Sequence, residues 1–143
     1  MNRKYKIVGL EVLDYDEGKV IAVKISKGLI QQWCLELCLL HHDLVNSIEI
    51  AESKTFSVGI VKEDNSKKDT AKSHHSKKYS RGRAVWHPTK PILYLSKAEL
   101  SYWVTFFLEH HRDGGSKVNH IDTELPLQGA EGFKSLSLIL QLV

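Results

Sequence analysis

The chain has 143 residues, 42% hydrophobic and 26% charged, which is the profile of one soluble globular domain spanning 1–143. No apolar run reaches the roughly 18 residues of a membrane-spanning helix, and the chain starts without the apolar core of a signal peptide, so we expect a cytoplasmic protein. The net charge of +3 hides an asymmetry: residues 67–83 hold seven basic side chains and one acidic one, whereas the remainder is net negative.

The N-terminal half is expected to form mostly strands. Two β-branched runs, 4–14 and 19–26, flank the turn residues 15–18 and predict a β-hairpin. Alternation and β-branched content predict two further strands at 47–51 and 55–61.

The segment 29–40 fits two different periods. Its apolar residues match a helical stripe made of Leu29, Ile30, Trp33, Leu37 and Leu40. They also match the strict alternation of a strand from Trp33 to Leu39. Because Lys27-Gly28 is a poor helix start and only Glu36 is charged, we expect a strand buried on most of both faces, with a helix as the alternative.

One principal amphipathic helix is expected at 96–112. Ser96 and Glu99 form a capping box at its start, and Gly114 or Gly115 can provide the left-handed stop. The i, i+3, i+4, i+7, i+8 spacing defines one buried face, made of Leu100, Trp103, Val104, Phe107 and Leu108. Polar substitution of Phe107 is therefore expected to unfold the protein.

The remaining apolar runs predict three more strands. A short strand at 92–95 precedes the helix, and strands at 117–124 and 135–143 are separated by a loop at 125–132. Strands on both sides of one helix predict an α+β domain, with a mainly antiparallel sheet and the helix packed on one face. We find no internal repeat.

Chemical motifs are few. The eight histidines form three adjacent pairs plus His87 and His120, without the spacing of a metal site, and His111 with His120 is the best pair. Cys34 and Cys38 lack the partners of a zinc site and are expected to be buried reduced thiols. GxSxG, P-loop and GxGxxG motifs are absent, so we expect no catalytic activity, no cofactor and no bound metal.

Residues 62–83 are almost entirely polar, so we expect a mobile basic loop. Its charges could bind RNA or DNA phosphates, dock on an acidic protein or only solvate the loop, and we favour a protein partner. The expected contact residues are Lys67, Lys68, Lys72, Lys77, Lys78, Tyr79, Arg81 and Arg83. Tyr102 and Phe106 join them because aromatic residues at the edge of a helical stripe either close the core or anchor a partner.

A family resemblance points the same way. The capped helix 96–112, then Gly114-Gly115, Val-Asn-His-Ile-Asp-Thr-Glu at 118–124 and a final apolar strand, resembles immunity proteins of bacterial toxin systems. The Trp-Cys-Leu-Glu-Leu run at 33–37 is similar to strands of that group. The resemblance implies a noncatalytic inhibitor that binds one cognate toxin tightly, and a basic loop would favour an acidic toxin surface. The alternative is a nucleic-acid-binding accessory protein that uses the loop 67–83.

Overall fold

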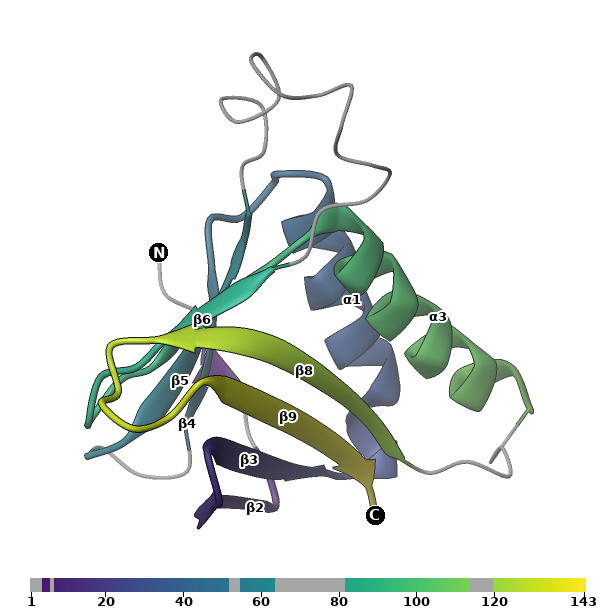
Figure 1. Ribbon diagram of the computed structural model, residues 1–143. Coiled ribbons are helices and arrows are strands. Elements are labelled where there is room, and N and C mark those ends of the chain that lie inside the picture. Colours follow the sequence, from purple (N-terminus) through teal and green to yellow (C-terminus); the bar gives the residue numbers. More distant parts are fainter. Residues whose placement is uncertain (1–3, 6, 52–54, 64–81, 114–119) are drawn as a thin grey trace.

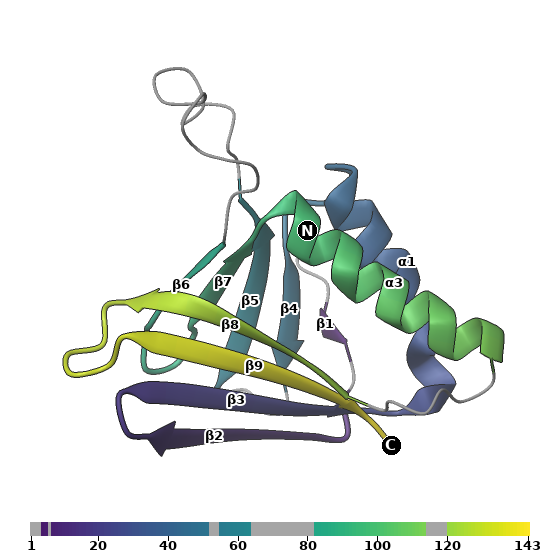
Figure 2. The same ribbon diagram turned by 45° about the vertical axis from the view of Figure 1, so that its right-hand side comes forward.

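The computed structural model describes residues 4–5, 7–51, 55–63, 82–113 and 120–143, which form a curved sheet with helices packed against it (Figure 1, Figure 2). Most of the expected loop at 62–83 lies outside the described residues. The strands are β1 (Lys4–Tyr5), β2 (Gly9–Tyr15), β3 (Gly18–Ile25), β4 (Ile48–Ala51), β5 (Ser57–Lys62), β6 (Arg83–Val85), β7 (Ile92–Leu95), β8 (His120–Gln128) and β9 (Ser135–Leu142). The helices are the 3-10 turn η1 (Lys27–Leu29), α1 (Ile30–His41) and α3 (Lys97–Asp113).

The sheet is mixed. Its nine strands lie in the order β1-β4-β5-β7-β6-β8-β9-β3-β2, and along this order the described pairings alternate between parallel and antiparallel. The α+β class is confirmed, but the expectation of a mainly antiparallel sheet with one helix is wrong. Each antiparallel pair is a hairpin of neighbouring runs, whereas each parallel pair joins distant segments that no local pattern reveals.

The segment 29–40 is helical, so the expected strand is wrong. Ile30, Trp33, Leu37 and Leu40 are buried at helical spacing, while Leu35, which the alternating pattern would have buried with Trp33 and Leu37, is 57% exposed. The poor start at Lys27-Gly28 is overcome by η1, where the Ser26 hydroxyl accepts a hydrogen bond from the Gly28 N–H at 3.2 Å.

The expected helix at 96–112 is confirmed as α3. Ser96 and Glu99 make both bonds of the capping box: Glu99 Oε1 accepts from the Ser96 N–H at 2.8 Å, and Ser96 Oγ accepts from the Glu99 N–H at 3.1 Å. Leu100, Trp103 and Phe107 are buried as expected, but Leu108 is 51% exposed. Within the described part of the chain, neither helix is long and apolar enough to cross a membrane.

The expected hairpin at the start of the chain is confirmed as β2-β3, although Lys4 and Tyr5 pair separately with β4. The expected loop at 125–132 is wrong in its first part, because β8 continues through Pro126 to Gln128. The Leu127 N–H bonds to the Lys134 carbonyl on the β9 side, so the Pro126 nitrogen faces the opposite edge of β8. Pairing with β6 on that edge begins only at Leu127. The proline is therefore tolerated because its position needs no N–H donor.

The two helices lie side by side against the curved sheet (Figure 1, Figure 2). The buried side chains of α1 and α3 meet the alternate, inward residues of the strands, such as those of β9. A buried hydrogen bond joins α3 to the sheet across this core: Trp103 Nε1 donates to Thr123 Oγ1 on β8 at 2.8 Å. The largest fully buried side chains include Trp33, Trp103 and Phe107, so both helices are essential to the core.

The topology contains an internal repeat that we did not find in the sequence. Both β2-β3-α1-β4-β5 and β6-β7-α3-β8-β9 consist of a hairpin, a helix and a second hairpin. Half of the sheet has the order β4-β5-β7-β6, and the other half has the equivalent order β8-β9-β3-β2. The hairpin after each helix therefore pairs with the hairpin before the other helix, and the two repeats are interleaved within one sheet.

The repeat is also visible in the residues of the two helices, where equivalent positions are 70 residues apart in the sequence. The equivalent pairs are Ser26 and Ser96, Lys27 and Lys97, Trp33 and Trp103, Leu37 and Phe107, and His41 and His111. Each Ser accepts a hydrogen bond from a backbone N–H at the start of its helical segment, and both tryptophans are buried. The helix positions thus have matched partners within one molecule.

Candidate functional site

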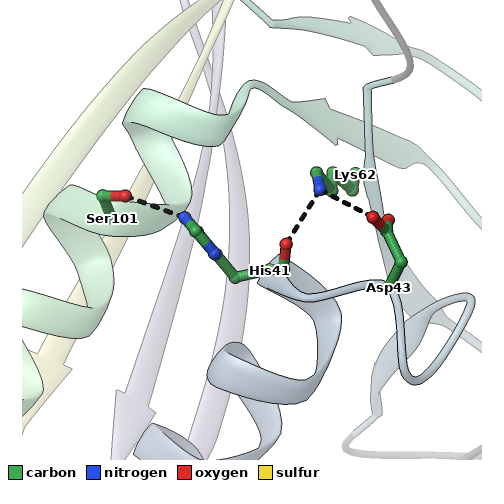
Figure 3. Close-up of polar contacts among 4 residues, drawn as sticks. All are labelled: His41, Asp43, Lys62 and Ser101. Atoms are coloured by element: carbon green, nitrogen blue, oxygen red, sulfur yellow. Dashed lines mark hydrogen bonds and ion pairs between the residues drawn. The ribbon is translucent and has the colours of Figure 1, made fainter.

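The candidate site lies where α1 ends, α3 begins and β5 ends, and Figure 3 shows its polar contacts. Each of these three elements contributes at least one basic side chain. We call this surface the basic end and define it by His41, His42, Lys62 and Lys97.

The last turn of α1 fixes the backbone of the basic end. The Leu44 N–H bonds to the Leu39 carbonyl at 2.8 Å, and the Asp43 N–H bonds to the Leu40 carbonyl at 3.1 Å, which is the Schellman pattern of a helix end. Asp43 takes the left-handed position, with φ of 62°, that glycine usually occupies.

Lys62 ties the end of β5 to the end of α1. Its Nζ donates to the His41 carbonyl oxygen at 2.8 Å and to Asp43 Oδ2 at 3.0 Å (Figure 3). The Lys62 side chain is 21% exposed and the Asp43 side chain 74%, so the pair sits at the surface. The carboxylate of Asp43 is therefore engaged by Lys62.

His41 also bonds to α3. Its Nε2 lies 2.9 Å from Ser101 Oγ (Figure 3). Burial lowers the pKa of His41 below its usual 6.5, the charges of His42, Lys62 and Lys97 lower it further, and Asp43 opposes them. The imidazole is therefore neutral at pH 7, and its nitrogen can accept the hydroxyl proton of Ser101 in a hydrogen bond.

A serine beside a neutral histidine is also the start of a nucleophile–base pair. The repeat explains it differently. Gln31 Nε2 lies 3.1 Å from His111 Nε2 at the opposite end of the helix pair, and Gln31 and His111 are the equivalents of Ser101 and His41. Because a glutamine amide is not a nucleophile, the property shared by both contacts is that each links α1 to α3.

The structure separates the expected contact residues. Arg83 lies in β6, where its Nε bonds to Glu63 Oε2 at 3.1 Å and its guanidinium stacks 4.1 Å from the Tyr94 ring centre. Tyr102 is 58% exposed, whereas Phe106 is half-buried against Phe107. The others, Lys67, Lys68, Lys72, Lys77, Lys78, Tyr79 and Arg81, lie outside the described residues.

The histidines and cysteines are dispersed. Among the residues with described positions, no three His, Cys, Asp or Glu side chains are grouped as metal ligands. His111 was expected toward the apolar side of α3, but it is exposed and His110 is buried instead. Burial, together with Cys38, raises the pKa of the Cys34 thiol to about 11, so this thiol is protonated at neutral pH.

Sequence reasoning missed a second polar cluster, around Lys19. This lysine is buried at the start of β3, with its Nζ 4.4 Å from the Trp86 ring centre, 4.2 Å from that of Phe133 and 2.8 Å from Asp14 Oδ1. Its place in the alternation of Ile21, Val23 and Ile25 was a signal that it faces inward. Trp86 and Phe133 both pack against the hydrophobic core. The cluster therefore closes one end of the core.

Comparison of the chain with models of known protein families and with curated protein sequences finds no match. The functional reading therefore depends on the geometry of the site.

Proposed function

We propose that the protein is a noncatalytic inhibitor of the immunity type, which binds one cognate bacterial toxin tightly in the cytoplasm. The observation that carries the proposal is the pairing of Ser101–His41 with Gln31–His111. The Ser101–His41 contact is the one among the described residues that most resembles catalytic machinery. Because Gln31–His111 repeats it without a nucleophile, we assign the Ser101–His41 contact a structural role. Binding of a partner protein through surface charge and exposed side chains then explains the basic end better than catalysis does.

The attachment points of the basic segment support this proposal. The Glu63 N–H bonds to the Leu95 carbonyl at 2.8 Å, and the Gly82 N–H bonds to Glu99 Oε1 at 3.0 Å. The first bond ties Glu63 to the last residue of β7, and the second ties Gly82 to the first turn of α3, which begins at Lys97. The lysines and arginines of 67–83 are thus joined covalently to the part of the molecule that carries the basic end.

The experiment is co-expression with the protein encoded beside this chain. We expect the intact chain to protect cells from that protein and to co-purify with it. A variant with the lysines and Arg81 of 67–81 changed to glutamine should lose protection while keeping its thermal midpoint. If the intact chain neither protects nor co-purifies, the immunity proposal is wrong.

The alternative is tested on the same protein. Binding of a generic RNA and of a DNA duplex is measured from about 50 to 200 mM salt, the range over which several phosphate contacts weaken affinity steeply. Steep salt-dependent binding by the intact chain that the glutamine variant loses, combined with no toxin partner, would favour the nucleic-acid accessory protein.

A further inference from the structure

The two helices leave one side of the molecule uncovered. In Figure 1 and Figure 2, α1 and α3 lie side by side on the sheet, and no other described element covers the side of the pair that faces away from it. The solvent side of a surface helix normally carries charged side chains. The exposed residues of α1 are instead Gln31, Gln32 and Leu35, and its single carboxylate, Glu36, is buried. This helix therefore presents no Asp, Glu, Lys or Arg to solvent, although 26% of the whole chain is charged.

A matching row of exposed residues runs along α3. We call the two rows together the helix face and define it by Gln31 and Leu35 on α1 and by Ser101, Thr105 and Leu108 on α3. Lys97 precedes the row on α3, and Arg112 follows it. Glu109 lies about 100° around the helix from Leu108. Leu35 is 57% exposed and Leu108 is 51% exposed, so the centre of the helix face is apolar and the charges lie around its rim.

The register of the helix pair brings the two exposed leucines to the same level. The contacts between α1 and α3 at the two ends of the pair are ten residues apart on each helix, so the helices are antiparallel and rise in step. Gln31 is level with His111, to which it bonds. Leu35 comes four residues after Gln31, and Leu108 comes three residues before His111. The two leucines are therefore level to within one residue, or about 1.5 Å along the helix axes.

We infer that the helix face is the contact between two copies of this chain. A twofold axis parallel to the helices and midway between them lays α1 of each copy on α3 of the other. Because rotation about an axis does not change a position along it, Leu35 meets the partner's Leu108 at nearly the same level, and Leu108 meets the partner's Leu35. The product is a bundle of four helices with an apolar centre.

The distribution of charge favours a second copy over a different protein. In a twofold contact each patch faces itself, so a charge near the axis would face an equal charge. The five residues that define the helix face are uncharged, so two copies meet there without repulsion. A partner recognised through its charge would find no complementary group at this centre. Depletion of charged residues around an apolar centre is also the composition of homodimer interfaces.

The first test measures the mass of the full chain in solution, with no other protein present. We expect sedimentation equilibrium at about 0.1 mM to give twice the mass of one chain. Leu35→Glu and Leu108→Glu should each raise the dissociation constant about tenfold or more, because each places a carboxylate in an apolar contact twice. Leu44→Glu is the matched control, since Leu44 is 71% exposed but follows α1 outside the helix face. It should change the dissociation constant less than about twofold.

A second test addresses the pairing of the two leucines. Leu35→Glu chains are mixed with Leu108→Lys chains, and neither variant should dimerise alone. In the mixed dimer the new glutamate meets the new lysine, while the unchanged Leu108 of one chain meets the unchanged Leu35 of the other. We expect the mixture to recover a dimer. Leu35→Glu mixed with Leu35→Lys is the control, because it carries the same charges without pairing them and should stay monomeric.

A wild-type chain that stays monomeric at about 0.5 mM would overturn the inference. Equal effects of Leu35→Glu and Leu44→Glu would also overturn it, as would equal recovery in the two mixtures. If the wild type is monomeric and Leu35→Glu loses binding to the protein encoded beside this chain, the occupant of the helix face is that protein and not a second copy. Unchanged far-ultraviolet circular dichroism shows that each variant is folded. Because the mass measurements need no toxin, their failure leaves the proposed function untouched.

Discussion

Glu99 Oε1 accepts a hydrogen bond from the Gly82 N–H at 3.0 Å, so the carboxylate that caps α3 also holds the residue before β6. The close approach requires a residue without a side chain. A Cβ on Gly82 would collide with the Tyr94 carbonyl oxygen and with the Glu99 carboxylate. One carboxylate therefore links the helix start to the strand that follows the basic segment.

Gly82→Ala should lower the free energy of unfolding by about 1–3 kcal/mol, because the new methyl group forces backbone or carboxylate to shift. Urea unfolding followed by tryptophan fluorescence measures the change. Gly28→Ala is the control, since its Cβ meets only ordinary contact and the equivalent position 98 already carries alanine. If both variants unfold at the same urea concentration as wild type, the packing at Gly82 is less tight than described.

Phe107→Asn should abolish the cooperative fold. The ring is fully buried between α3 and the sheet, and truncating a buried phenylalanine alone costs about 3–5 kcal/mol before any polar group is buried. Phe107→Leu, which matches Leu37 at the equivalent position, should cost much less, and circular dichroism with thermal unfolding separates the two. A cooperative transition in Phe107→Asn near the wild-type midpoint would contradict this prediction.

Thr123→Val should destabilise the protein by about 1–3 kcal/mol, because it leaves the buried Trp103 Nε1–H without its acceptor. Thr123→Ser keeps the hydroxyl and should retain most of the stability. Denaturant unfolding of both variants, and of each combined with Trp103→Phe, isolates the coupling between the two side chains. Additive effects in that double-mutant cycle would show that the bond contributes nothing.

His41 makes stability depend on pH. Its pKa is lowered in the folded protein, so between the folded and unfolded values the unfolded chain binds more protons. The stability contribution of the neutral ring is therefore complete above about pH 6.5 and is lost as the pH falls through the lowered folded-state pKa. Thermal midpoints measured from pH 8 to pH 5 should fall less steeply in His41→Gln than in wild type.

His120→Gln is the control for that experiment, because it removes an exposed histidine that belongs to β8 and not to α1 or α3. Glutamine at position 41 can still form a hydrogen bond with Ser101. The comparison of His41→Gln with wild type therefore measures the effect of protonating the imidazole and not the loss of the contact. Identical slopes in wild type and His41→Gln would mean that His41 does not carry the effect.

Sequence patterns predicted correctly those elements that are stabilised by contacts between residues close together in the sequence. The capping box of Ser96 and Glu99 and the hairpin β2-β3 were both predicted from adjacent residues. The segment 29–40 was not decidable in this way, because Leu35 and Leu39 gave it a period of two as well as a helical period. Only the sheet that buries Trp33 and Leu37 selects the helix.

The repeat and the site depend on distant contacts. The turn between β2 and β3 has two residues, whereas six separate β6 from β7, so the strands lose the spacing that the helices keep. Tyr102 was predicted as a contact residue from the edge of its helix. The link from Lys62 to Asp43 and to the His41 carbonyl crosses from a strand to a helix end, and no sequence pattern indicates it.

The pairing of β3 with β9 governs the order in which the protein can be completed during synthesis. Gly18 to Ile25 lie in register with Ser135 to Leu142, although 117 positions separate each pair. The early hairpin therefore emerges from the ribosome with its β3 edge unpaired, and this edge stays unpaired until β9 has been made. That edge is where we expect a nascent chain to meet chaperones or to aggregate.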